Sequence, residues 1–411
     1  MEIVTIVGML GGQKAHYKFD KQLSKNFKLK KHDYKNILPL LIDNFSNDCE
    51  IIPIFTNQAK DAQIKVLKDE FGKDYSFIFN EKYFIKNETD YYGILSLINK
   101  VIAEDDEYII DLSHGFRHIP ILATISLIAH NINSSNIEHI LYAKEITQRK
   151  EYEIIDLKEY LELANMSYML ASFADNYTIS KITFTDPTFQ ALSDSLSNLS
   201  DDILSNSIKD IFEKLKITID NIDSIKCNEK ISAFSHSLTK VREHIEELQA
   251  IGKYQENSRK LYEFSKLLGK RGYLLNAITL LFEAIGCYCM ESLKEAAIAI
   301  KEYIEIHKNH YEQAKVSRDI IITKKIKIAK NSKLEIIKIR EAAQKEINNL
   351  FKYTNIQDFK NFIKEAKDLK NNLSHGNHEE SVTDAKNIFI LLAEDYKKFC
   401  IDANILKVKN R

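Results

Sequence analysis

The sequence predicts two structural classes in one chain, an α/β Rossmann-like amino-terminal domain and an all-α carboxy-terminal half. Two observations support this division. All four prolines and six of the eleven glycines lie within the first 187 of the 411 residues, so the residues that interrupt regular structure become rare afterwards. Over the same first part, short runs rich in β-branched residues alternate with helical stretches, which is typical of a mostly parallel sheet covered on both faces.

Six runs are expected to form the strands, because they are short, apolar and rich in Val, Ile, Tyr and Phe. They are EIVTIV (2–7), IIPIF (51–55), YSFIF (75–79), EYIIDL (107–112), IEHILYA (137–143) and YEIIDL (152–157). From about Lys158 the pattern becomes helical. We therefore expect an amino-terminal sensing domain over residues 1–175, a helical connector over 176–250 and a helical effector domain over 251–411.

Composition limits the classes of function and the compartment. The formal net charge of −1 gives no overall field toward nucleic acid, so such a partner must bind a local patch. Five cysteines without paired CxxC elements indicate a reduced, cytoplasmic protein without a structural zinc site. The first ten residues indicate a buried strand rather than a secretion signal. The apolar stretch 274–290 is short and carries Glu283, so we expect a buried helix and no membrane partner.

The segment 315–345 is rich in lysine. Such a segment is either the solvated face of a helix or a basic guide for a polyanion. The residues themselves are compatible with both interpretations.

The tetrapeptide LSHG occurs twice, at 112–115 and 373–376, in different surroundings. The first copy lies within 107–130, where the pattern predicts a strand, a loop and then a helix with Pro120 in its first turn. The loop therefore lies at the carboxyl end of a parallel strand and at the start of a helix. Backbone N–H groups and the helix dipole favour anions at that position.

The side chains of this loop are suited to phosphate. Ser113 supplies a hydroxyl, Gly115 permits close approach of the backbone, and Arg117 and His118 supply charge or hydrogen bonds. Two further loops follow expected strands, a glycine turn at 8–13 and the pair Thr56-Asn57. The glycine turn lacks the GxGxxG spacing. Together the three loops predict a nucleotide-like ligand bound without a dinucleotide fingerprint.

Two other interpretations of the first LSHG exist. Ser113 could be a nucleophile at a strand-to-helix elbow, but that motif requires a glycine where this chain has Asp111, and no acid and base partner can be assigned. The simplest alternative is structural, with the serine capping the helix and His114 packed or solvated.

The run DLSHGFRHIPILA (111–123) resembles the signature of the CARF sensor domains found in ancillary proteins of type III CRISPR systems. The early LGGQ segment (10–13) with Tyr17 is similar to the first-strand loop of that family. The resemblance covers about the first 170 residues and implies a homodimer that binds a cyclic oligoadenylate across its two-fold axis. The pocket residues that it implies are Gly11, Gly12, Gln13, Thr56, Asn57, Ser113, His114, Gly115 and Arg117.

The second LSHG closes an amphipathic helix. Within 355–378, apolar residues from Ile356 to Leu373 recur at helical spacing, and Gly376 is suited to the C′ position that ends a helix. His375 therefore lies in the last turn, where a protonated histidine would interact favourably with the helix dipole. That electrostatic role is the structural explanation of the residue.

The functional explanation is an RNA-cleaving group formed by Lys370, Asn371 and His375. Asn371 and His375 are four residues apart and share a helix face. RNA cleavage without a metal needs a base for the 2′-hydroxyl, an acid for the leaving 5′-oxygen and positive charge for the transition state. Histidine is suited to the proton transfers near neutral pH, and the lysine supplies the charge.

This region resembles the HEPN ribonuclease domain, whose motif is an arginine, a polar residue, a few variable positions and a histidine near the end of a late helix. Lys370 stands where the family has arginine, and it keeps the charge but loses the bidentate fork. Once lysine is admitted, the pairs 230/236 and 301/307 match the spacing by chance. Only 370–375 combines the following asparagine, the helix end and the glycine stop.

The two resemblances together imply a cytoplasmic homodimer in type III CRISPR antiviral defence. Cyclic oligoadenylate would act as the allosteric activator, single-stranded RNA would be the substrate, and no cofactor or metal would be required. The main alternative is a binding module, in which the same sensor is fused to a helical domain that has lost its catalytic arginine.

Overall fold

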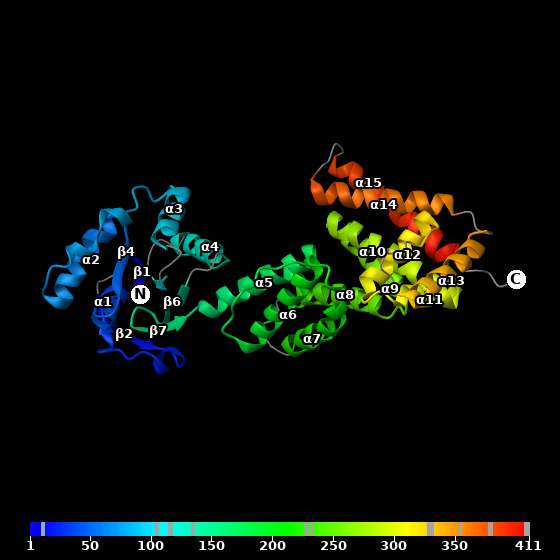
Figure 1. Ribbon diagram of the computed structural model, residues 1–411. Coiled ribbons are helices and arrows are strands. Elements are labelled where there is room, and N and C mark those ends of the chain that lie inside the picture. The colour runs from blue at the N-terminus through cyan, green and yellow to red at the C-terminus, as the bar shows by residue number, and fades with distance from the viewer. Residues whose placement is uncertain are drawn as a thin grey trace. The chain divides into compact units, whose positions relative to one another are not determined.

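The computed structural model describes residues 1–9, 13–102, 107–113, 118–132, 136–226, 231, 234–326, 333–352, 356–376 and 381–406. Its internal contacts divide the chain into two compact units, Met1–Met169 and Leu170–Arg411 (Figure 1). The division lies inside helix α5 (Lys158–Asn176). The first boundary expected from the sequence, at residue 175, lies near the end of the same helix.

The first unit contains a seven-stranded mixed sheet with the order β3-β2-β7-β6-β5-β1-β4. Strands β4, β1, β5 and β6 are parallel neighbours, and β2 is parallel to β7. The β6–β7 and β2–β3 pairs are antiparallel. The strands are β1 (Glu2–Ile6), β2 (Ala15–Phe19), β3 (Asp33–Tyr34), β4 (Glu50–Ile54), β5 (Glu107–Asp111), β6 (Asn136–Thr147) and β7 (Glu151–Asp156).

Helices cover both faces of this sheet (Figure 1). Val4 and Ile6 of β1 pack in one core with side chains of α3 (Tyr91–Val101) and α4 (His118–Ile132). Ile3 points to the opposite face, where it packs with side chains of α1 (Ile37–Phe45). Neighbouring side chains of β1 are buried on opposite faces of the sheet, which explains why the sequence of this strand is almost continuously apolar. The unit therefore has the α/β architecture that the sequence predicts.

The expectation of a strand at 75–79 is wrong. Residues Ser76–Ile78 form a short 3-10 helix instead. Asp74 accepts hydrogen bonds from the backbone N and the hydroxyl of Ser76, which favours a turn over extended backbone. Phe77 is 75% exposed, so this run does not bury alternate side chains as a strand would. Two further 3-10 helices span Leu23–Lys25 and Glu81–Tyr83.

Strand β2 was not predicted from the sequence, and only its first three residues alternate between buried and exposed positions. Ala15 and Tyr17 are buried, and His16 between them is exposed. The strand pairs with β7 in parallel, so it extends the sheet on the side away from β4. Its short, half-polar pattern is a weak signal compared with the apolar central strands.

Among its described residues, the second unit contains helices and connecting loops and no strand. Asp186 caps α6, whose first residue is Pro187, and the segment expected to be a connector, 176–250, contributes packed helices to this unit. Its helices are α6 (Pro187–Leu204), α7 (Ile208–Lys226), α8 (Ser235–Gly252), α9 (Asn257–Lys270), α10 (Leu274–Ala296), α11 (Ile298–Glu305), α12 (His310–Thr323), α13 (Leu334–Leu350), α14 (Gln357–His375), α15 (Val382–Tyr396) and the π-helical segment Lys397–Asp402.

Helix α10 is the centre of this unit and packs against α9, α12 and α14. Most of its side chains are buried, as expected for a helix with apolar residues on every side. Among the described residues it is also the helix that is long and apolar enough to cross a membrane, and 67% of its most apolar window is buried within the protein. The lysine-rich segment contributes to α12 and α13, where Lys315 and Lys338 are exposed.

Candidate functional site

The carboxyl ends of three parallel strands meet at one edge of the sheet. Ile6 of β1 is aligned with Ile54 of β4, and Thr5 is aligned with Asp111 of β5. The backbone N of Val7 continues this alignment with a 3.1 Å hydrogen bond to the carbonyl of Ile54. The loops that follow these strands therefore leave the sheet at the same edge, as their order in a parallel sheet requires.

Ser113 is fixed in this edge by three hydrogen bonds. Its hydroxyl donates to Asp111 and accepts from the backbone N of Ala143 in β6 at 2.8 Å, and its backbone N donates to Asp111 at 3.1 Å. Asp111 is fully buried, and its other carboxylate oxygen accepts from the hydroxyl of Thr5 at 2.6 Å. One carboxylate thus joins the ends of β1 and β5 to the start of the loop.

This arrangement argues against Ser113 as a nucleophile. A serine nucleophile needs a base that accepts its proton, whereas this hydroxyl donates to a carboxylate that two further donors already occupy. The geometry instead suits a structural role, in which Ser113 is held at the end of β5 by its hydrogen bonds to Asp111 and Ala143.

Thr56 and Asn57 lie at the start of α2 (Asn57–Phe71). Thr56 is buried and its hydroxyl caps the helix by accepting from the backbone N of Ala59 at 3.3 Å, while Asn57 is exposed. In the next turn of α2, Gln63 donates a 2.6 Å hydrogen bond to the carbonyl of Gly8, two residues after the end of β1. This bond places the loop after β1 beside the first turns of α2.

Several of the expected ligand residues cannot be placed. Gly11, Gly12, His114, Gly115 and Arg117 lie outside the described residues. Gln13 is described and exposed. The structure thus brings the loops of Thr56 and Ser113 to one edge of the sheet, and shows that both hydroxyls already have structural partners.

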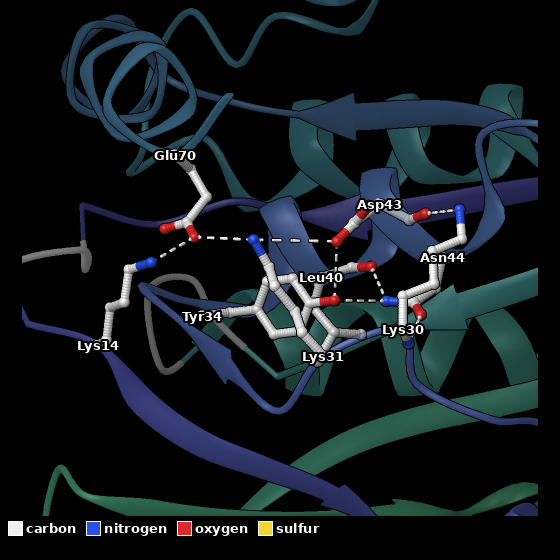
Figure 2. Close-up of polar contacts among 8 residues, drawn as sticks. All are labelled: Lys14, Lys30, Lys31, Tyr34, Leu40, Asp43, Asn44 and Glu70. Carbon is white, nitrogen blue, oxygen red and sulfur yellow. Dashed lines mark hydrogen bonds and ion pairs between the residues drawn. The ribbon is translucent and has the colours of Figure 1, made fainter. Parts of the chain in front are cut away.

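A charged cluster next to the loop after β1 was missed by the sequence analysis (Figure 2). The side chain of Glu70, at the end of α2, is fully buried, and the ammonium groups of Lys14 and Lys31 lie 2.9 and 3.1 Å from its Oε1 atom. Figure 2 shows that the two lysines approach this carboxylate from two sides. Lys31 also lies over the ring of Tyr34, whose hydroxyl donates to Asp43.

Glu70 is ionised because its lysine partners outweigh its burial. Burial raises the pKa of the carboxyl, but the hydrogen bonds and charges of Lys14 and Lys31 leave the net pKa below its ordinary value. The ion pair therefore joins Lys14, directly before β2, to the end of α2. No spacing in the sequence relates Glu70 to Lys14, which explains why the pair was not predicted.

The second predicted site lies at the end of α14, as expected. The helix ends at His375, and Gly376 follows it in the left-handed conformation with φ of 64°, which glycine adopts without strain. Ser374 donates a 2.8 Å hydrogen bond to the carbonyl of Lys370 one turn earlier. Lys370 and Asn371 are half-buried and His375 is exposed, so the histidine is open to a substrate.

Lys370 does not extend freely into solvent. Its ammonium lies 5.5 Å from the ring centroid of Phe282 in α10. The guanidinium carbon of Arg318, from α12, lies 3.9 Å from the same centroid. Arg318 also donates a 2.7 Å hydrogen bond to the carbonyl of Phe282 and lies 3.6 Å from the carboxylate of Glu283. Glu283, an isolated charge in an apolar helix, thus pairs with a buried arginine.

The sequence contained a signal for this cluster. An arginine just before the apolar run 320–322 of α12 and a glutamate in the middle of α10 are costly to bury unless they meet a partner. Either residue alone gives no indication of the partner, and the proximity of both to Lys370 follows from the packing of three helices. Among the described residues no group of three or more His, Cys, Asp or Glu side chains is placed to hold a metal ion.

Comparison with known proteins adds no further constraint. No protein-family model matches the chain, and no curated protein matches it. The candidate sites therefore stand on their own geometry and on the resemblance of their motifs.

Proposed function

We propose that the chain is a cyclic-oligoadenylate-activated, metal-independent endoribonuclease that cleaves single-stranded RNA in type III CRISPR defence. The observation that carries the proposal is the placement of the two LSHG motifs. Leu112 and Ser113 of the first motif follow the buried Asp111 at the carboxyl edge of the sheet, and the second motif closes α14 with an exposed histidine. The first placement suits a phosphate-bearing ligand, and the second suits proton transfer to and from a substrate.

The proposed chemistry at the α14 site uses three side chains. The 2′-hydroxyl of the RNA loses its proton and attacks the adjacent phosphorus, the bond to the 5′-oxygen breaks, and that oxygen gains a proton. His375 carries out proton transfer, Lys370 stabilises the extra negative charge of the transition state, and Asn371 orients the phosphate. The products are a 2′,3′-cyclic phosphate and a 5′-hydroxyl.

In this proposal the active form is a cytoplasmic homodimer with one α14 site per protomer. Cyclic oligoadenylate binds the strand-end loops of both protomers and stabilises the dimer state in which the two α14 sites are aligned. A ligand shifts that equilibrium only by its difference in affinity for the two states. Activation by the ligand therefore requires that the strand-end loops have different conformations in the two states of the dimer.

The presence of lysine at position 370, where the HEPN motif has arginine, favours one alternative function. In this alternative the protein is a cyclic-oligoadenylate sensor whose helical domain no longer cleaves RNA. The two functions differ in one assay. Fluorescent single-stranded RNA is incubated with the protein in EDTA, with cyclic tetra-adenylate, cyclic hexa-adenylate or neither, and binding of each ring is measured in parallel by calorimetry. Ring-dependent cleavage supports the nuclease, whereas ring binding without cleavage supports the sensor alone.

A further inference from the structure

Two cations from different helices lie near the ring of Phe282. Phe282 lies in α10 and is 9% exposed, with the ammonium of Lys370 from α14 and the guanidinium of Arg318 from α12 both placed against its ring. An aromatic ring attracts a cation through its quadrupole when the charge lies within about 6 Å of the centroid. Both cations meet this condition.

Arg318 holds the ring in place and does not reach solvent. It is 4% exposed, and its Nη1 atom donates to the backbone carbonyl of Phe282 itself. Gly286, one turn later in α10, leaves room for it, since a Cβ atom there would lie 2.7 Å from Nη1. The carboxylate of Glu283 lies 3.6 Å from Arg318 and offsets its positive charge. Arg318 therefore fixes the ring without strongly repelling the ammonium of Lys370.

Lys370 has the more flexible side chain of the two cations. Its ammonium is at the end of a flexible four-carbon stem, unlike the planar fork of an arginine, so a free lysine on a helix surface samples many rotamers. Contact with a fixed ring restricts those rotamers before substrate arrives. Such restriction lowers the cost of aligning a charge with a transition state.

We propose that Phe282, held by Arg318, is a positioning residue that keeps the ammonium of Lys370 in place for RNA cleavage. The inference rests on the function proposed above, and it explains how a lysine serves where a rigid guanidinium would be expected. Phe282 is not proposed to touch RNA and acts only through Lys370.

The test compares variants of the full-length protein by a spectroscopic and a kinetic measurement. Lysines are reductively methylated with ¹³C-formaldehyde, which keeps their charge, and the Lys370 methyl signal is assigned by its disappearance in Lys370→Arg. A methyl group above an aromatic face resonates upfield. The Lys370 signal should be shifted upfield in the native protein and in Phe282→Tyr, and should move to the position of exposed lysines in Phe282→Leu.

The kinetic measurement is RNA cleavage by the unmethylated proteins at saturating activator. Phe282→Leu should lower kcat by about five- to tenfold, as expected for the loss of about 1 kcal/mol of cation–π interaction, with KM unchanged and with activity retained in Phe282→Tyr. The matched control is Phe362→Leu, a buried ring in α14 that packs against Phe359 and Phe399. It should lower Tm without lowering kcat at a temperature where the protein stays folded.

The two measurements separate the failure of this inference from the failure of the proposed function. An unshifted Lys370 signal in the native protein would overturn the positioning role even if RNA is cleaved. A shifted signal in a protein that cleaves no RNA under any condition would overturn the catalytic purpose of the contact. An equal loss of kcat in Phe282→Leu and Phe362→Leu would reduce Phe282 to a packing residue.

Discussion

The hydroxyl of Thr5 and the carboxylate of Asp111 form a buried hydrogen bond of 2.6 Å that joins β1 to β5 at their carboxyl ends. The other oxygen of Asp111 accepts from both the backbone N and the hydroxyl of Ser113. Two strands and the start of the first LSHG loop thus share one buried carboxylate. Because a buried carboxylate is stable only with its donors in place, loss of any one of these donors should destabilise this edge of the sheet.

Ser113→Ala should destabilise the protein and weaken binding of cyclic oligoadenylate. The substitution removes a donor to Asp111 and leaves the backbone N of Ala143 without its acceptor, which should lower the free energy of unfolding by about 1–2 kcal/mol. Chemical denaturation and calorimetric titration with the ring measure the two effects.

A matched control for Ser113→Ala is Ser96→Ala, an exposed serine of α3 in the same unit. It should change neither stability nor ring affinity. If Ser113→Ala left both quantities at the native value, the hydrogen bonds of the loop would be irrelevant to the ligand. Loss of an esterase activity on Ser113→Ala would instead favour the nucleophile interpretation.

Glu70→Gln should lower the free energy of unfolding at neutral pH and make it less dependent on pH in the acid range. The pKa of Glu70 in the folded protein lies below its ordinary value of 4.5, so its ionised form contributes stability above that pH. This contribution is lost as the pH falls from about 4.5 through the lower folded pKa. The variant should lose about 2 kcal/mol at pH 7 and should show a smaller further loss than the native protein on acidification.

The comparison for Glu70 is Asp69→Asn, at the neighbouring position in α2. Asp69 lies 2.9 Å from Lys35, but its side chain is 64% exposed, so the pair should contribute little. Denaturation curves at pH 7, 5 and 3.5 for the native protein, Glu70→Gln and Asp69→Asn measure how the stability of each depends on pH. Parallel acid profiles for the native protein and Glu70→Gln would contradict the lowered pKa of Glu70.

Two substitutions of Lys370 test whether this lysine takes the role of the arginine in the HEPN motif. Lys370→Gln removes the charge that stabilises the transition state and should lower kcat by about 100-fold. Lys370→Arg restores a fork that binds phosphate in two places and should raise kcat by roughly two- to fivefold. Single-turnover cleavage at saturating activator measures both, and equal rates for Lys370→Gln and the native protein would exclude Lys370 from the chemistry.

The α/β class and the all-α second half could be predicted because their signals are local. The apolar runs of β1, β4 and β5 and the stripe of α14 each identify an element without knowledge of the rest of the chain. The end of α14 at Gly376 follows from local backbone preference as well. The prediction of a strand at 75–79 was wrong because it used only the β-branched and aromatic composition of this run. That composition does not show that Asp74 starts a turn.

The partners of the site residues could not be predicted because they depend on contacts across long separations in sequence. Thr5 meets Asp111, Lys14 meets Glu70, and Lys370 meets Phe282 only once the sheet and the helices have packed. The residue types at Ser113 and His375 were recognisable beforehand. Their hydrogen bonds, exposure and neighbouring charges were not.

The most direct test of the proposed function is the cleavage of single-stranded RNA in EDTA by the native protein and by His375→Ala, each with saturating cyclic oligoadenylate. We expect the native protein to cleave RNA rapidly, only with the ring present, and to leave 2′,3′-cyclic phosphate ends. His375→Ala should lose at least about 100-fold of this activity with ring affinity unchanged. Cleavage by His375→Ala at the native rate would contradict this proposal.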